Sequence, residues 1–293
     1  MGLSSNFAEM IGHFSSRFAI PRVADVFLPP LHDGGPPDEE KFMALFLPGG
    51  ATGISYVMIP AEEAAAYEAL RRQDLIGTDP SALAYGFGSG EPVRDMLALA
   101  SINAICQHVM NETDYQPDHV TDPTGLLSVE KGDRVGMVGL FSGLATRIQE
   151  PGAELVVIER DERLIEDHPA LPITLDATRL SSCNKVLCTA VTVLNNSLDE
   201  VLGHCSPDAF VSVIGPSAGY FPDPLFASGV DVVGGRVVTH SEAFLQRLIA
   251  GERWTDTTQK TCFQKRTYQS IMKVERAAEV RPHRADRRGT DVR

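Results

Sequence analysis

The chain has 293 residues, 43% of them hydrophobic and 22% charged, a balance typical of a globular protein large enough for two domains. It has no run of 18 apolar residues, and its N-terminal segment lacks a basic leader and an apolar stretch, so we expect a cytoplasmic protein that does not enter the membrane. The net charge is −13, and the 254 residues before Thr255 carry 34 acidic against 16 basic groups, which disfavours binding to nucleic-acid phosphates.

The first third of the chain predicts an α+β domain over residues 1–115. Apolar residues recur at helical spacing over residues 7–18, and residues 32–40 have the composition of a loop. Three short strands are expected at residues 22–28, 41–47 and 53–59, followed by two helices at residues 61–72 and 93–110. Strands first and helices afterwards is the order typical of an α+β domain.

After a turn-rich linker at residues 116–132, the pattern changes to that of a Rossmann-like α/β domain over residues 133–254. Short apolar runs predict strands at residues 133–138, 153–158, 184–190, 209–214 and 230–233, and helices are expected between and after them at residues 142–149, 197–202, 223–226 and 241–249. Such an alternation predicts a parallel sheet covered on both faces, with ligands beyond the carboxyl ends of its strands. Residues 255–293 hold ten basic and five acidic groups and are expected to form a disordered tail.

The first candidate site is a glycine turn after the first strand of this sheet. Gly136, Gly139 and Gly143 do not have the spacing G-x-G-x-x-G, but Gly139 stands at the strand end, where a backbone without Cβ lets a ligand approach closely. Glu159 ends the next strand, 20 residues later, where nucleotide-type cofactor sites place a ribose-binding carboxylate. The alternatives are close strand–helix packing for the glycines and, for Glu159, a solvated acid beside Arg160.

The ends of the next two strands carry further polar residues. Thr189 and Asn195 fall where the third strand meets its helix, although Ser197 and Glu200 could instead form a capping box there. Gly215, Pro216 and Ser217 follow the fourth strand directly. Such a turn can hold an anion with its hydroxyl and backbone N–H groups, or it can be an ordinary turn.

Two residues of the first domain are further candidates. Asn103 lies inside an otherwise apolar helix, and an unpaired buried amide costs about 1–3 kcal/mol. It is therefore expected to bond either to its own helix or at the domain junction. Glu91 precedes a proline at a helix start, which suits a cap or a site acid.

The sequence contains no metal-binding motif of the C-x-x-C, H-x-x-x-H or H-E-x-x-H type. Its five cysteines are an odd number and widely spread, which indicates reduced thiols rather than a disulfide framework. Two loose groups could converge only through the fold, namely Cys183 and Cys188 with His204 and Cys205, and Asp118 with His119 and Asp122.

Several segments together resemble the family described as "putative heavy-metal chelation", a domain of otherwise unknown function. They are VGMVGLF at residues 135–141, ELVVIER at 154–160, TAVTVLNNSLDEVL at 189–202, IGPSAGYFPDPLFASGVDVVGG at 214–235 and EPVRDMLALASINAI at 91–105. The resemblance implies an enolase N-terminal-like first domain, a Rossmann-like second domain, a homodimer and a site between the domains. The site residues carried over, with the neighbouring candidates, are Gly139, Phe141, Glu159, Thr189, Asn195, Gly215, Pro216, Ser217, Asn103 and Glu91.

Ala190 departs from the family pattern, in which a second threonine is expected, and so does the basic extension past Trp254. The leading hypothesis is a protein that handles a small molecule or metal chelate in the interdomain cleft, as an enzyme of metallophore or chelator metabolism whose reaction the sequence does not name. One alternative is an enzyme that uses a nucleotide-type cofactor, S-adenosylmethionine or NAD. The other is a non-catalytic binder of a divalent transition metal.

Overall fold

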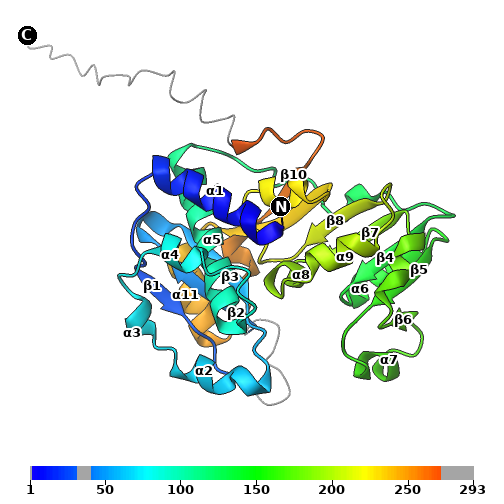
Figure 1. Cartoon of the computed structure of the whole chain (residues 1–293), viewed down its shortest axis with the longest axis horizontal. Helices are drawn as coiled ribbons and strands as arrows, with labels where there is room; N and C mark the ends of the chain where they lie inside the picture. The colour runs from blue at the N-terminus through cyan, green and yellow to red at the C-terminus, as the bar shows by residue number, and fades with distance from the viewer. Residues whose placement is uncertain (1, 32–40, 272–293) are drawn as a thin grey trace, which may run out of the picture.

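Two β-sheets organise the chain, which we describe from a computed structural model over residues 2–31 and 41–271. One sheet has three antiparallel strands in the order β1-β2-β3, and the other has seven strands in the order β10-β9-β8-β7-β4-β5-β6. Figure 1 shows them as two lobes lying side by side, with the three-stranded sheet in the first lobe and the row from β8 to β6 in the second. The predicted α/β fold with a Rossmann-like sheet is confirmed.

The first lobe is built around one long buried helix, α5. Its elements are α1 (Leu3–Arg17), β1 (Asp25–Phe27), β2 (Phe42–Phe46), β3 (Thr52–Tyr56), α2 (Ala64–Ala69), α3 (Arg72–Leu75), α4 (Pro80–Ala84) and α5 (Pro92–Glu112). Strand β3 crosses α5 so closely that a Cβ on Gly53 would lie 1.8 Å from the carbonyl oxygen of Ala100. The single helix predicted over residues 61–72 is wrong, because α2 ends at Ala69 and Leu70 is extended.

The second lobe is doubly wound. Its elements are η4 (Gly125–Leu127), β4 (Arg134–Val138), α6 (Ser142–Gln149), β5 (Glu154–Ile158), α7 (Arg163–Asp167), β6 (Ile173–Thr174), η5 (Ala177–Ser182), β7 (Lys185–Thr189), α8 (Val191–Leu194), α9 (Leu198–His204), β8 (Phe210–Ile214), α10 (Asp223–Ala227), β9 (Val232–Val238), α11 (Ser241–Ala250), η6 (Thr255–Thr257) and β10 (Thr258–Gln264). The strands from β4 to β9 pair in parallel, and only β10 is antiparallel to its neighbour.

Both faces of this sheet are covered, as the continuous apolar strands predicted. On β7, Leu187 belongs to the apolar cluster beneath α6, whereas Val186 and Cys188 belong to the larger cluster that includes Leu198 and Val201 of α9. Because successive strand residues point to opposite faces, a strand buried on both sides has no polar face. This accounts for the absence of alternation in the sequence of β7.

The C-terminal part of the described chain departs from the prediction of a tail that begins at residue 255. Strand β10 pairs with β9 along its whole length, and Tyr268 donates a hydrogen bond of 2.6 Å to Asp223. Helix α11 leaves the second lobe and lies beside the first sheet, as the orange helix in Figure 1 shows. Its Phe244 and Leu248 pack with Phe42 of that sheet. Residues 272–293 of the expected tail, like the expected loop at residues 32–40, lie outside the described residues.

Candidate functional site

The second lobe has a topological switch point between β4 and β7. Counted from β4, the parallel strands lie in the order 3-2-1-4-5-6, the arrangement in which ligands bind where the winding reverses. At that point Gly139 follows β4 directly with φ +83°, and a Cβ there would lie 2.7 Å from Cγ2 of Thr189 at the end of β7. The fold therefore brings these two predicted residues into contact. Residue 139 must be glycine both because its φ is positive and because Thr189 leaves no room for a Cβ.

Glu159 faces the same turn from the end of β5. Its carboxylate accepts hydrogen bonds from the backbone N–H of Leu140 at 2.5 Å and of Arg160 at 3.2 Å. Glu159 thus holds the chain between β4 and α6 in place, and its side chain is only half-buried. Phe141, also half-buried, is the N-cap of α6 and makes no capping bond with its side chain.

The segment after β7 does not form the capping box that Ser197 and Glu200 could have made. Ser197 instead donates its hydroxyl to Oδ1 of Asn195 at 2.6 Å, and Glu200 lies 3.9 Å from Arg160. Among the described residues, no acceptor is within hydrogen-bond distance of Nδ2 of Asn195, which is half-buried. Asn195 therefore keeps a donor for a ligand.

The sequence patterns did not single out Asp95, a buried carboxylate on α5. Only 2% of it is exposed, yet it accepts five hydrogen bonds. They come from Gly88 N–H at 2.8 Å, Ser89 N–H at 3.0 Å and hydroxyl at 3.1 Å, Gly90 N–H at 3.0 Å, and Nδ2 of Asn196 at 2.6 Å. Asp95 thereby fixes a glycine loop of the first lobe to the turn after α8 in the second.

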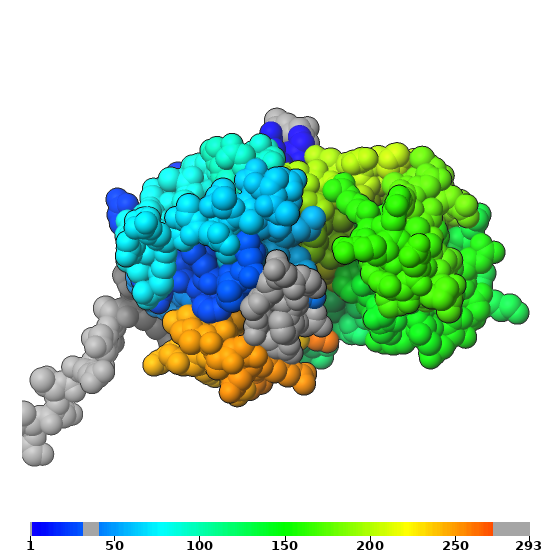
Figure 2. Space-filling view, turned by 90° about the horizontal axis from the view of Figure 1, so that it is seen from below, coloured from blue at the N-terminus to red at the C-terminus, as the bar shows by residue number. Residues whose placement is uncertain are grey.

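A cavity of about 120 Å³ lies at this junction, and both lobes line it. The first lobe contributes Met58, Pro60, Gly90, Pro92 and Asp95, and the second contributes Leu194, Asn195 and Asn196. Figure 2 shows a recess between the blue, cyan and orange lobe and the green one. Glu91 is exposed beside the cavity and does not line it, and its side chain does not cap α5.

Ser217 and Asn103 join the lobes through hydrogen bonds. The hydroxyl of Ser217 accepts the backbone N–H of Tyr56 at 3.0 Å, and its carbonyl accepts Nδ2 of Asn103 at 2.8 Å. Asn103 also donates to the carbonyl of Ile54 at 2.8 Å, which settles its alternatives in favour of the domain junction. The Ser217 hydroxyl oxygen thus accepts a hydrogen bond at the junction, and its role toward an anion stays a prediction. Gly215 and Pro216 are half-buried, and a Cβ on Gly215 would lie 2.8 Å from Cβ of Ala190.

The expected metal-ligand groups do not form within residues 2–31 and 41–271, where no set of three His, Cys, Asp or Glu side chains could hold an ion. Burial raises the pKa of Cys106 to about 12 and of Cys205 and Cys262 to about 11, and it raises those of Cys183 and Cys188 as well. Burial therefore disfavours the thiolate form of each of these side chains. Asp118 and Asp122 serve their own turns, accepting hydrogen bonds from Thr121 and Thr124.

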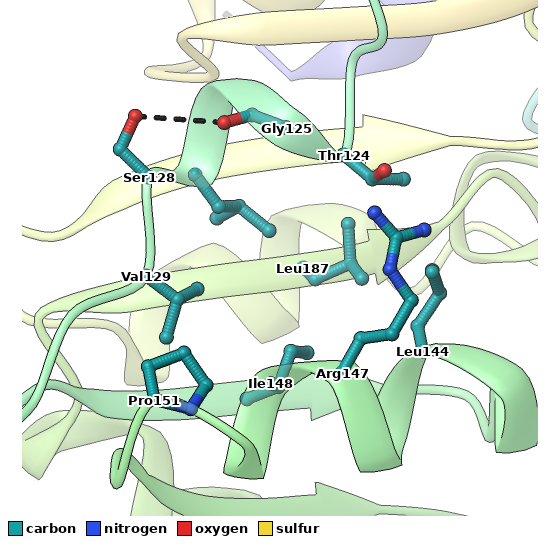
Figure 3. Close-up of a pocket in the computed structure, with 10 residues that line it drawn as sticks. Thr124, Gly125, Ser128, Val129, Leu144, Arg147, Ile148, Pro151 and Leu187 are labelled. Atoms are coloured by element: carbon teal, nitrogen blue, oxygen red, sulfur yellow. Dashed lines mark hydrogen bonds between the residues drawn. The ribbon is translucent and has the colours of Figure 1, made fainter.

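A second cavity, of about 150 Å³, lies on a face of the large sheet and not at its carboxyl edge. Figure 3 shows Leu144, Arg147 and Ile148 of α6 facing Thr124, Gly125 and Ser128 near η4, with Leu187 of β7 between them. None of the predicted site residues lines it. The switch point and the junction cavity are thus where the candidate residues gather.

Comparison with known proteins agrees with the predicted resemblance. A family model described as "Putative heavy-metal chelation" matches residues 122–266. Residues 122–266 belong to this family. The same family, DUF364, includes two solved structures of unknown function that resemble this chain over both lobes. One is from Desulfitobacterium hafniense (20% identity, TM-score 0.64, covering 89% of this chain and 98% of the other) and one from Pyrococcus horikoshii (17%, 0.65, 89% and 99%).

At these identities the two structures show a shared fold and nothing more. No curated protein matches the chain significantly. None of the described helices is long and apolar enough to cross a membrane.

Proposed function

We propose that this protein binds a small organic metal chelator, free or carrying its metal, in the cleft between the lobes, and that it acts on it as an enzyme of chelator metabolism. The observation that carries the proposal is the convergence of Gly139, Glu159, Thr189 and Asn195 on the carboxyl edge that faces the first lobe. The family's description supplies the ligand class. The homodimer and the cytoplasmic location stay predictions from the sequence.

The polar groups at the cleft suit an organic ligand better than a bare ion. Nδ2 of Asn195 can donate to a carboxylate or hydroxyl oxygen, and the half-buried carboxylate of Glu159 retains lone pairs for a hydroxyl or ammonium group. The thiols, whose pKa values burial raises, are held in the protonated form. In this proposal, metal enters the cleft already held by its chelator.

The test is native mass spectrometry with elemental analysis of protein purified without chelators. Co-purification of an organic molecule, with or without metal, supports the proposal, and its mass identifies the chelator. The variant Asn195→Leu removes the free donor and should release that molecule, whereas Gln246→Leu, on the exposed side of α11, should retain it. Metal bound stoichiometrically without any organic partner would contradict the proposal.

A second candidate is an enzyme that uses S-adenosylmethionine or NAD, favoured by the 3-2-1-4-5-6 strand order and the position of Glu159. The backbone N–H of Leu140, which a cofactor could use in this turn, already donates to Glu159. Thermal denaturation with each cofactor at millimolar concentration distinguishes the two ideas. A rise in melting temperature that Glu159→Gln abolishes would favour the nucleotide cofactor.

A further inference from the structure

A second interlobe cavity, larger than the first, lies toward the other end of α5. It is open to solvent, has a volume of about 290 Å³ and is lined by residues of the β2–β3 turn, α5, the segment after α5, the end of β9, the start of α11, and β10. Gln107 of α5 lines it, whereas Asp95 lines the junction cavity. Twelve residues of α-helix separate these two positions by about 18 Å, so the cavities are distinct.

The frame of this cavity is held by a buried side chain that bridges the lobes. Gln107 is 8% exposed; its Oε1 accepts the backbone N–H of Thr52 at 2.8 Å, and its Nε2 donates to the carbonyl of Val238. Because both sheets are tied to the same amide, the cavity is formed before a ligand arrives. Preformed sites avoid the cost of ordering their walls on binding.

The rim of the cavity offers uncharged hydrogen-bonding groups without partners. Within the described chain, the side chains of Asn111, Gln116, Ser241 and Gln259 make no hydrogen bond. Ser241 is also the first residue of α11, whose N-cap residue provides no capping bond, so the backbone N–H groups of its first turn face no partner in the helix.

His119 adds a ring whose donor and acceptor nitrogens can be assigned. Its Nδ1 lies 2.7 Å from the carbonyl oxygen of Lys260, which can only accept a hydrogen bond, so Nδ1 carries the proton. In the neutral ring, Nε2 is then an acceptor. The rim therefore combines donors and acceptors, while Met110, Val237 and Val238 supply an apolar wall.

We propose that this cavity binds a sugar ring, either as a free monosaccharide or as part of a nucleoside. Among the described residues that line it there is no lysine, arginine, aspartate or glutamate, so a charged ligand would find no counter-charge. A sugar presents C–H groups that pack on an apolar wall and hydroxyls that both donate and accept. This site is independent of the chelator site, since it shares no lining residue with the junction cavity.

The experiment uses the intact chain in saturation-transfer NMR and calorimetry with D-ribose, D-glucose and adenosine as probes. At least one should bind with a Kd below about 1 mM, which is within the affinity that a ligand of this size can reach. Ser241→Trp, which fills the cavity mouth, and the milder Gln259→Leu should each weaken binding at least tenfold. Gln246→Trp, on the exposed side of the same helix, should leave it unchanged.

The outcomes distinguish a free sugar from a nucleoside as the ligand. Binding of D-ribose or D-glucose alone indicates a free sugar, and binding of adenosine without either indicates a nucleoside. Failure of all three probes to bind, or binding that survives both cavity variants, overturns the proposal. Tenfold tighter binding of AMP than of adenosine would also overturn it, because the site would then favour charge. Retention of the chelator by Ser241→Trp keeps this result separate from the chelator proposal.

Discussion

Substitution of Asp95 should lower the free energy of unfolding more than most substitutions in the first lobe, although Asp95 lies on a helix and pairs with no cation in the described chain. It is 2% exposed, and its two oxygens accept five hydrogen bonds. The variant Asp95→Asn replaces one carboxylate oxygen by an NH₂ group, which cannot accept hydrogen bonds from the N–H donors that face it. The smaller loss, at Oδ2, removes the bonds from Gly90 and Asn196.

Hydrogen bonds to a charged group contribute about 1.5–3 kcal/mol each, so two of them predict a loss of about 3–6 kcal/mol in the free energy of unfolding. Urea denaturation followed by circular dichroism measures it. Asn196→Gly keeps the positive φ of 58° accessible and removes only one of the five bonds, so about 1.5–3 kcal/mol is expected.

The control for this series is Asp79→Asn in the same lobe. Asp79 is exposed and accepts one hydrogen bond, from the N–H of Ser81 at the start of α4, and the amide oxygen of Asn can accept the same bond, so the loss should stay below about 1 kcal/mol. If Asp95→Asn cost no more than Asp79→Asn, the carboxylate would not be holding the glycine loop, and the account of the junction would be wrong.

Three further predictions follow from single contacts. Gly139→Ala places a Cβ 2.7 Å from Thr189 at a positive φ, so the free energy of unfolding should fall by about 1–3 kcal/mol, and Thr189→Ser should restore part of it in urea titrations. Hydrogen bonds from Arg72 lower the pKa of Asp25, so this pair stabilises the fold above the ordinary aspartate pKa and the gain is lost as pH falls through the lowered value. Arg72→Gln should therefore lower the free energy of unfolding more at pH 7 than at pH 2, as urea titrations at the two pH values would show. Because burial raises the pKa values of all five thiols, iodoacetamide at pH 8 should label them far more slowly in the native protein than in guanidinium, as mass spectrometry would show; fast native labelling would contradict their burial.

The parallel sheet was predictable because each of its central strands is a short apolar run bounded by turn residues. Strand β10 was not predictable. Its buried and exposed residues do not alternate, its sequence is not continuously apolar, and it stands in a basic stretch of the chain. The place of α11 was equally hidden. Its apolar stripe predicts a helix with a buried face, but the partner, the sheet that includes Phe42 and Phe46, lies about 200 residues earlier in the chain.

The candidate site was predictable to the extent that it depends on strand ends. Carboxyl ends of parallel strands meet at one edge, so Gly139, Glu159 and Thr189 were expected together and lie together. Asp95 and Ser217 depend on pairings across 101 and 161 residues, which no local pattern encodes. The one clue to Asp95 was its position just inside a helix after the loop Gly-Ser-Gly, where an acidic side chain can reach back to backbone N–H groups.

These long-range pairings also decide how the cleft can behave. Asp95, Asn103 and Gln107 stand at three levels of α5, and each bonds to the second lobe, through Asn196, Ser217 and Val238 respectively. A hinge would need all three contacts to break, which exposes a buried carboxylate and two buried amides. The lobes therefore present a fixed cleft, and a ligand that fits it binds without the cost of closing two domains.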